Sequence, residues 1–463
     1  MKTHQYFSVA THLKVVFILF ASTAITGCQK DFEKVSAINS DNTSNATTTN
    51  PNIVLILADD IGYEIPTCNG GQSYQTPNLD LMAKNGMRFT QCQASPMCSP
   101  SRFMLLTGKY NFRNYTEWGK MDLSQQTIAN MLKSAGYDTY TLGKWQFDNG
   151  DQAVKTFGFS NHYAIFDPFA VGGTNSGGGE GVGHYKSPKL YINGSYVDEA
   201  LTKDKYCDDI LTDSLVNYAR ASKQAQKPFF IYYAMGLCHS PFSPTPDDPE
   251  YKNWDPTSKV SDVSFFPSMV KYMDKKIGQI ISRFDSMNLT QNTVFIFLGD
   301  NGTPPQITSQ FNGTTIKGGK GSTTIYGTHV PLLIYWKGTV ASNKINNDLI
   351  DFTDFLPTIA DIATTPVPTT YGKLDGVSFY PRLLGNSGTP RDWVFCHFDP
   401  QHKNDKPLKR FIQNVTYKLY DSTGLFYNII NDPKEKKALL SSGLTADEKQ
   451  LKSNFQSIMN TLH

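Results

Sequence analysis

Two runs of consecutive apolar residues constrain the fold of this chain more than any other feature. They cover residues 52–58 and 293–298, and each continues for six or seven positions almost without a polar residue. Such runs are typical of parallel strands that are buried on both faces. Between them the sequence alternates between helical and strand-like patterns, which favours an α/β fold. We therefore predict one large, mixed, mostly parallel sheet between helices.

The other expected elements divide the chain into a main domain over residues 51–385 and a smaller α+β subdomain over residues 386–463. Helical patterns cover residues 78–86, 127–136, 211–224, 267–288 and 351–363. Further strands of the main sheet are expected at residues 137–142, 229–233 and 331–336. From about Asp375 the pattern changes to short strands, expected at residues 393–398, 411–420 and 425–430, and a final charged helix.

The composition excludes several classes of protein. A formal charge of +2, from 43 basic and 41 acidic residues, gives no indication of a nucleic-acid partner. Seven cysteines in 463 residues do not form a disulfide framework. Apart from Cys28 and Cys98, treated below, the number of cysteines is odd, so at least one is expected to be unpaired: Cys68, Cys92, Cys207, Cys238 and Cys396.

The N-terminus is typical of an exported protein. Lys2 and Lys14 precede a short apolar run, and small residues lead to Ile25-Thr-Gly-Cys28, which predicts a signal peptide over residues 1–27. This run is too short to span a bilayer, and no later run reaches that length. Ile-Thr-Gly-Cys resembles a bacterial lipobox, which implies that Cys28 is lipidated. The alternative is an ordinary secretory signal with an incidental cysteine.

The residues after Cys28 are rich in Ser, Thr and Asn, so residues 28–50 are predicted to be the lipidated cysteine and a flexible tether. Two or more acyl chains make a stable membrane anchor. We expect a lipoprotein of the cell envelope, either periplasmic or exposed at the outer face of the outer membrane.

Acidic and amide residues directly follow both apolar runs. Asp59 and Asp60 follow the first run, and Asp300 and Asn301 follow the second. Ligands gather at the carboxyl ends of parallel strands, so these side chains are expected to converge. Their oxygen atoms suit a hard cation such as Ca²⁺ or Mg²⁺. The alternative is that each pair caps a following helix or turn.

The segment Cys98-Ser-Pro-Ser-Arg102 comes directly before an apolar run that ends in Leu-Thr-Gly108. A thiol at the start of a helix lies where free N–H groups and the helix dipole favour anions, and an arginine follows one turn later. A buried cysteine at a turn is the alternative. The pattern Cys-x-Pro-Ser-Arg with Leu-Thr-Gly behind it resembles the type I sulfatases of the alkaline phosphatase superfamily. In that family the cysteine is oxidised to formylglycine, which acts as its hydrated aldehyde.

The resemblance covers roughly residues 51–385, and its further motifs occur in the order found in that family. They are Ala58-Asp-Asp-Ile-Gly62, Thr76-Pro-Asn-Leu-Asp80, Gly86-Met-Arg-Phe89, Gly143-Lys-Trp145, His239-Ser-Pro-Phe242, Gly299-Asp-Asn-Gly302, Gly319-Lys-Gly321 and Asp375-Gly-Val-Ser-Phe379. The resemblance implies an alkaline-phosphatase-like fold. It also implies a maturation partner, a formylglycine-generating or sulfatase-maturing enzyme.

Particular roles follow from the resemblance, residue by residue. It implies that formylglycine at position 98 binds Ca²⁺, or alternatively Mg²⁺, together with Asp59, Asp60, Asp300 and Asn301. Arg102 would hold the gem-diol, while Lys144, His239 and Lys320 would contact the sulfate group. His239 or Lys320 would protonate the leaving alcohol. Lys317 competes with Lys320 for its role, although the register with the family favours Lys320.

Two positions depart from the family pattern. Gln146 stands where the family has a histidine after Gly-Lys-Trp, and glutamine cannot take up a proton. We expect Gln146 to keep the hydrogen-bonding geometry near the substrate. After Lys320, the family's Glu-Gly-Gly-x-Arg reads Ile-Tyr-Gly-Thr-His329 here. His329 is then either near the substrate or structural.

A glycine-rich segment over residues 169–185 contains His184 and lacks the ending of a phosphate-binding loop. It is either a flexible surface loop or a lid that brings His184 to the substrate.

The family resemblance, together with the predicted lipoprotein anchor, predicts a calcium-dependent sulfatase acting on sulfated carbohydrates. Two alternatives are a phosphoester or phosphonate hydrolase of the same superfamily, and a surface lipoprotein that binds sulfated glycans with impaired catalysis.

Overall fold

The computed structural model describes residues 50–117, 119–147, 150–165, 184–257, 260–399 and 408–462. Residues 48–463 form one compact unit. The predicted signal peptide, Cys28, almost all of the tether and most of the glycine-rich segment lie outside the described residues. Within the described ranges, no helix is both long and apolar enough to cross a membrane.

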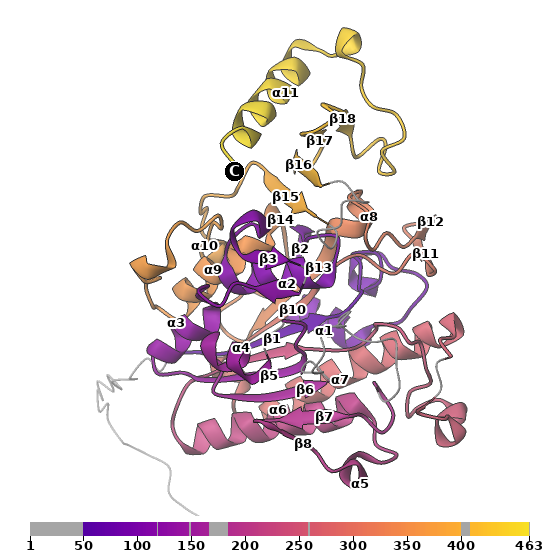
Figure 1. Cartoon of the computed structure of the whole chain (residues 1–463), viewed down its shortest axis with the longest axis vertical. Coiled ribbons are helices and arrows are strands. Elements are labelled where there is room, and N and C mark those ends of the chain that lie inside the picture. Colours follow the sequence, from indigo (N-terminus) through magenta and orange to yellow (C-terminus); the bar gives the residue numbers. More distant parts are fainter. Residues whose placement is uncertain are drawn as a thin grey trace, which may run out of the picture. The chain divides into compact units, whose positions relative to one another are not determined.

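A ten-stranded sheet forms the centre of this unit (Figure 1). From edge to edge its strands are β14 (Lys344–Asp351), β2 (Met87–Gln93), β13 (His329–Trp336), β10 (Thr293–Gly299), β1 (Asn52–Ala58), β9 (Phe229–Ala234), β5 (Asp138–Lys144), β6 (Asn161–Ile165), β7 (Leu190–Ile192) and β8 (Ser195–Tyr196). Strands β10, β1, β9, β5 and β6 are parallel to one another, whereas β13 and β7 run antiparallel to their neighbours. The predicted mixed, mostly parallel sheet is confirmed.

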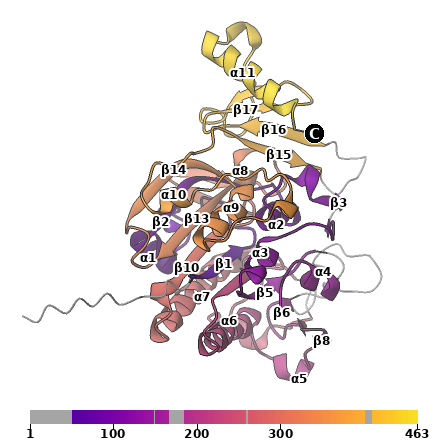
Figure 2. The ribbon, with the colours of Figure 1, turned by 90° about the vertical axis from the view of Figure 1, so that its left-hand side faces the viewer.

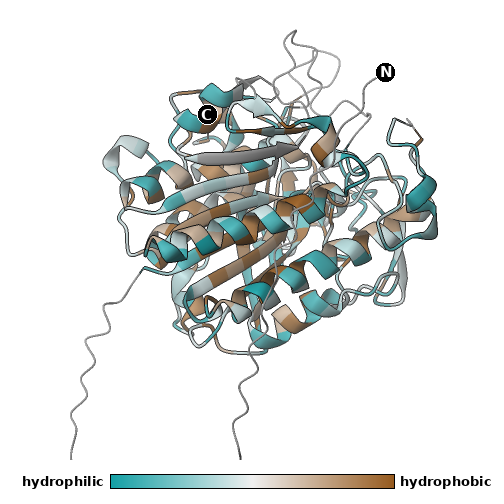
Figure 3. Ribbon diagram, turned by 90° about the horizontal axis from the view of Figure 1, so that it is seen from below, coloured by the Kyte–Doolittle hydropathy of each residue, from teal (hydrophilic) through white to brown (hydrophobic). Residues whose placement is uncertain are grey.

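Helices cover both faces of the sheet, and strand β1 shows why its sequence is apolar throughout. Ile53, Leu55 and Leu57 belong to one core, with α2 (Cys98–Thr107), α3 (Ile128–Ser134) and α9 (Phe355–Ile362). The alternate residues, Val54 and Ile56 among them, belong to a second core with α1 (Pro77–Asn85), α6 (Cys207–Gln224) and α7 (Phe266–Ser286) (Figure 2). Figure 3 shows the apolar strands between helices that are hydrophilic on their outer sides. A strand between two helical layers needs apolar residues at every position.

The C-terminal part is a four-stranded antiparallel sheet with one helix against it. The strands are β15 (Val394–Phe398), β16 (Lys409–Gln413), β17 (Tyr417–Tyr420) and β18 (Phe426–Asn428), and the helix is α11 (Ala446–Met459). Shorter elements complete the fold: β3 (Tyr115–Glu117), β4 (Lys120–Met121), α4 (Gly150–Thr156), α5 (Glu199–Thr202), β11 (Thr308–Phe311), β12 (Thr314–Lys317), α8 (Ile325–Thr328) and α10 (Tyr380–Leu383).

Two expected elements differ in detail from the structure. The strand expected at residues 411–420 is two strands, because the Asn414 side chain accepts hydrogen bonds from the N–H groups of Thr416 and Tyr417 and so closes a turn between them. The helix expected from residue 351 begins as a 3₁₀ turn. Asp351 is the last residue of β14, and its side chain caps that turn by accepting from the N–H of Thr353.

The register of the parallel strands determines where the functional site lies. Ala58 is paired with Gly299, and Ala234 is paired with both Leu57 and Gly143. The strands β1, β10, β9 and β5 therefore end at the same edge of the sheet. Gly143 has a φ of +91°, and a Cβ atom there would meet the Ala234 carbonyl oxygen at 1.9 Å, so only glycine fits this close approach.

Candidate active site

The acidic residues after β1 and β10 meet at this edge. The backbone N–H of Asp60 donates to Asp300 Oδ1 at 3.0 Å, and both side chains are buried. One ligand atom from each of Asp59, Asp60, Cys98 and Asp300 lies within 4.8 Å of the others. These carboxylates therefore do not cap separate helices or turns but form a single cluster.

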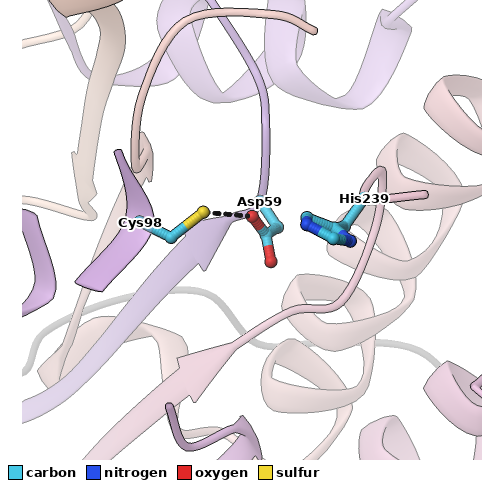
Figure 4. Close-up of side chains that lie close together, drawn as sticks. All are labelled: Asp59, Cys98 and His239. Carbon is cyan, nitrogen blue, oxygen red and sulfur yellow. Dashed lines mark hydrogen bonds between the residues drawn. The ribbon is translucent and has the colours of Figure 1, made fainter. Parts of the chain in front are cut away.

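Cys98 joins the cluster from the first turn of α2. Its Sγ lies 3.3 Å from Asp59 Oδ1 and 3.8 Å from Asp60 Oδ1. Figure 4 shows Sγ pointing at the Asp59 carboxylate, with His239 on the other side of Asp59. Burial and the nearby Asp300 and Asp59 carboxylates raise the pKa of the Cys98 thiol well above its usual range. An unmodified thiol here is neutral and a poor nucleophile, because the thiolate is the reactive form.

Three cationic side chains reach the three carboxylates. Arg102, one helical turn after Cys98, donates from Nη2 to Asp300 Oδ2 at 2.7 Å. Lys144 Nζ lies 2.5 Å from Asp59 Oδ2, and Lys320 Nζ lies 2.7 Å from Asp60 Oδ2. These contacts pair each carboxylate with a positive charge.

The charges shift the pKa values within the cluster. Burial alone would raise the pKa of Asp59, but Lys144, His239 and Arg102 outweigh it and hold this pKa well below its usual range. Burial, together with the Asp59 carboxylate, raises the pKa of Asp300 to about 6. The pKa of Lys320 is raised by Asp60 even though burial opposes the shift. Lys320 is therefore charged at neutral pH.

His239 lies at the solvent side of the cluster, with its side chain 16% exposed and Nε2 3.9 Å from Asp60 Oδ2. Burial, with Lys144 and Lys320, lowers the pKa of His239 to about 4, so the ring is neutral at neutral pH. Its Nδ1 lies 2.6 Å from the carbonyl oxygen of Ser240, which favours the tautomer with the proton on Nδ1. The neighbouring ring nitrogen, Nε2, then carries a lone pair toward the cluster.

The donor set fits a hard divalent cation. Asn301 donates from Nδ2 to Asp60 Oδ1 at 2.8 Å and to the Gly302 carbonyl at 2.9 Å. Its Oδ1 is buried and receives no hydrogen bond from any described residue. Buried polar atoms normally have a partner. Three carboxylates and one amide oxygen without a donor are the ligands that Ca²⁺ and Mg²⁺ bind.

Gln146 follows Lys144 by two residues and has an unusual backbone conformation. Its φ is +53°, and Asp60 has a φ of +61°. Residues other than glycine in this region are uncommon and are enriched at active sites. The Gln146 Oε1 atom is buried and receives no hydrogen bond within the described part of the chain. Gln146 therefore retains an acceptor for a ligand or a water molecule.

The other three candidates lie in different surroundings. The His329 ring stacks on Tyr63 with 4.0 Å between ring centroids, and its Nε2 lies 2.9 Å from the Thr90 carbonyl, contacts that belong to packing. Lys317 is exposed on β12, so the structure favours Lys320. His184 is buried at one end of the glycine-rich segment.

Three residues that the sequence did not reveal support the site. The Tyr185 hydroxyl lies 2.8 Å from the Gly236 carbonyl and 2.6 Å from the His239 carbonyl, so it holds the loop that carries His239. The Thr303 hydroxyl donates to buried Glu64 and accepts from the Gly62 N–H, which ties the segment after Asn301 to the segment after Asp60. These contacts join residues that are more than 50 or more than 230 positions apart, so no local pattern indicates them.

The described cysteines are all free thiols. They are Cys68, Cys92, Cys98, Cys207, Cys238 and Cys396. The expectation that at least one remaining cysteine is unpaired is confirmed, and no disulfide joins the described segments.

Comparison with known families agrees with the geometry. The family model described as Sulfatase matches residues 51–365, more than half of the chain. The chain belongs to the sulfatase family. A second model, described as N-sulphoglucosamine sulphohydrolase, C-terminal, matches residues 325–461 of this sulfatase.

Individual relatives extend over most of the chain. Arylsulfatase G of Rattus norvegicus is 30% identical, over 74% of this chain and 71% of the relative. An N-acetylgalactosamine-6-O-sulfatase of Bacteroides thetaiotaomicron is 28% identical, over 80% of this chain and 82% of the relative. The crystal structure of Ps i-CgsB superposes with a TM-score of 0.74 at 25% identity, and covers 89% of this chain and 93% of that one. The protein is a sulfuric ester hydrolase with an alkaline-phosphatase-like fold.

Because a proton on Asp300 competes with a cation, we predict that calcium affinity depends on pH. The pKa of Asp300 is about 6 in the metal-free protein, so affinity should be constant above that pH and fall as the pH decreases below it. Isothermal titration calorimetry measures this. Asp300→Asn should weaken calcium binding at neutral pH, whereas Asp247→Asn, which alters an exposed pair with Lys275, should not. Equal affinity at about pH 5 and about pH 7 would contradict this assignment.

Proposed function

We propose that this sulfatase is calcium-dependent and uses formylglycine made from Cys98. The observation that carries the proposal is the position of Cys98 Sγ, which is buried against Asp59 and Asp60 at the point where the three carboxylates meet. When formed, formylglycine supplies a hydrated aldehyde whose hydroxyl is the nucleophile. The fit of Asp59, Asp60, Asp300 and Asn301 to a hard cation supports calcium as the metal.

The cationic residues account for the binding of an anionic substrate. Arg102, Lys144 and Lys320 already balance the three carboxylates, so a divalent cation gives the site a net positive charge. A sulfate ester carries a negative charge, and the same positive groups stabilise the charge that develops on its oxygens during transfer, each contact typically giving ~10²-fold or more in rate. We assign the contacts with these oxygens to Lys144 and Lys320.

The electrostatics also favour one proton donor for the leaving alcohol. Lys320 carries its proton at neutral pH, while His239 is neutral and its Nε2 is an acceptor. We assign donation of the proton to Lys320. The Nε2 atom of His239 can only accept a hydrogen bond, so we assign to it a bond from a hydroxyl of the substrate beside the ester.

The substrate is proposed to be a sulfated carbohydrate. Support comes from the relative in Bacteroides thetaiotaomicron, named as an N-acetylgalactosamine-6-O-sulfatase. The buried acceptor of Gln146 provides a group that can receive a hydrogen bond from a sugar hydroxyl or a bound water. Sulfate release from a panel of sulfated mono- and oligosaccharides tests this class, and release of phosphate from the matching phosphorylated sugars as the main activity would contradict it.

Single replacements of Lys320 and Lys317 should show which of the two lysines contributes to catalysis. Lys320→Ala removes the charge beside Asp60 and should lower kcat/KM for sulfate release by ~10²-fold or more. Lys317→Ala changes an exposed residue of the same segment and should leave kcat/KM unchanged. Equal effects of the two variants would show that Lys320 has no special role.

Formylglycine itself can be detected by mass spectrometry. The tryptic peptide of residues 89–102, from protein purified out of its own host, should be lighter than the cysteine form, because a CH₂SH group becomes an aldehyde. The conversion requires a maturation enzyme, which is the partner we propose. Cys98→Ala should abolish turnover while it preserves the fold. An unmodified Cys98 in protein that still releases sulfate would refute the formylglycine assignment.

We also propose that the protein is anchored in the cell envelope by lipid on Cys28, either facing the periplasm or exposed at the surface. The sequence Ile25-Thr-Gly-Cys28 supports this. Wild-type protein should partition into the detergent phase of a Triton X-114 extract, and Cys28→Ser into the aqueous phase. Identical partition of both would exclude the anchor.

A further inference from the structure

The segment that carries Lys320 is held on one side by the main domain. The Lys320 N–H donates to the Thr303 carbonyl at 3.0 Å, and the Gly321 N–H donates to the Pro96 carbonyl at 2.8 Å. These bonds attach the segment to the residues after Asn301 and to those before Cys98. Three residues after Lys320, Thr323 is buried, and its contacts lead to the C-terminal sheet.

Lys418 and Tyr420 of β17 contact Thr323 directly. Lys418 Nζ lies 2.5 Å from the Thr323 carbonyl oxygen, and the Tyr420 hydroxyl lies 2.8 Å from Thr323 Oγ1. Glu435, which follows β18, joins the two, with Oε1 2.7 Å from Lys418 Nζ and Oε2 2.5 Å from the Tyr420 hydroxyl. We name Lys418, Tyr420 and Glu435 the Thr323 clamp.

The alternation of side chains along β17 explains why the clamp residues Lys418 and Tyr420 both face the main domain. Side chains alternate along a strand, so Lys418 and Tyr420 share one face, and Leu419 between them lies in the core that also contains residues of α11. Lys418 is fully buried, with its ammonium 4.3 Å from the centre of the Phe411 ring. A buried lysine is costly unless it is paired, and here a carboxylate, a carbonyl and an aromatic face surround it.

The same face of the sheet also contacts the start of α2. Cys396, Phe398 and Phe411 form a small apolar cluster against which Met97 and Tyr420 pack. Met97 immediately precedes Cys98. One face of the C-terminal sheet therefore contacts both the residue before Cys98 and the segment that carries Lys320.

We propose that the Thr323 clamp positions Lys320 for sulfate transfer, so that the C-terminal sheet is part of the catalytic apparatus although it contributes no reacting group. This rests on the proposed role of Lys320. The Lys320 side chain is long and partly exposed, and a fixed backbone beneath it reduces the conformations it must lose when substrate binds. Lys418, Tyr420 and Glu435 are positioning residues that act through Thr323.

Tyr420→Phe is the primary test, because it removes one hydroxyl and keeps the ring packed against Phe411. We expect kcat/KM for sulfate release to fall about tenfold, the equivalent of one hydrogen bond. Thr323→Val, which removes the partner hydroxyl, should give a similar loss. Asp421→Asn is the matched control. The adjacent Asp421 pairs with Arg410, which bonds the carbonyl of Met459 and lies over the Phe395 ring, and none of these groups contacts Thr323, so kcat/KM should not change.

A double-mutant cycle with Lys320→Ala distinguishes positioning from general destabilisation. In that background Tyr420→Phe should cause no further loss, because the group it positions is absent. An equal loss in both backgrounds would overturn the proposal, and so would unchanged kcat/KM in Tyr420→Phe. Thermal unfolding of each variant checks that the compared proteins are folded at the assay temperature.

The role of the Thr323 clamp can be tested even if the proposed substrate is wrong. If the wild type released no sulfate from any sugar of the panel, the substrate assignment would fall, and the same cycle would be run on binding of inorganic sulfate to the calcium-loaded protein. The clamp would be supported if Tyr420→Phe weakened sulfate binding in the wild-type background and had no effect on it in the Lys320→Ala background. Equal binding in Tyr420→Phe and wild type would refute it.

Discussion

Three carboxylates buried at one point of the structure impose the constraint on which the site depends. Asp59, Asp60 and Asp300 have almost no access to water, so they cannot all remain ionised unless positive charges lie beside them. Arg102, Lys144 and Lys320 provide these charges from three segments of the chain. The arrangement has a cost in desolvation that a purely structural site need not carry. We propose that this cost is retained because the cluster binds a divalent cation and the sulfate ester.

The parallel sheet makes this concentration of charge possible. Strands β1, β10, β9 and β5 end in register, so their following residues converge without long loops. Helix α2 adds Cys98 and Arg102 one turn apart on the same side. Because these strands and α2 are packed in two apolar cores, the backbone that carries these groups is held in place before any ligand binds.

The C-terminal sheet completes the arrangement from outside the main sheet. Its apolar side packs with α11 and continues into the main core, while its other side contacts Met97 and Thr323. A subdomain that packs against two segments of the active site affects catalysis through the positions of side chains it does not contain.

From the sequence alone one can predict the strands over residues 52–58 and 293–298, the mixed α/β sheet and the members of the main cluster. Uninterrupted apolar runs and residues with distinctive chemistry are local features, so they can be identified without knowing which segments meet. The motifs around Asp59, Cys98, Lys144 and Asp300 belong to this category. Strands β2 and β14, which pair with each other at one end of the sheet, escaped prediction because their residues are mixed in polarity.

Which groups contact one another follows only from the fold. In the structure Lys320, and not Lys317, lies against Asp60, and His329 packs against Tyr63 and Thr90. The surroundings of these side chains come from segments that are distant in sequence. The structure also split residues 411–420 at Asn414, and it revealed the contacts of Tyr185, Thr303 and Tyr420. The sequence does not show whether a hydroxyl or a lysine is exposed or buried against a carboxylate. The packing of elements that are distant in sequence determines this.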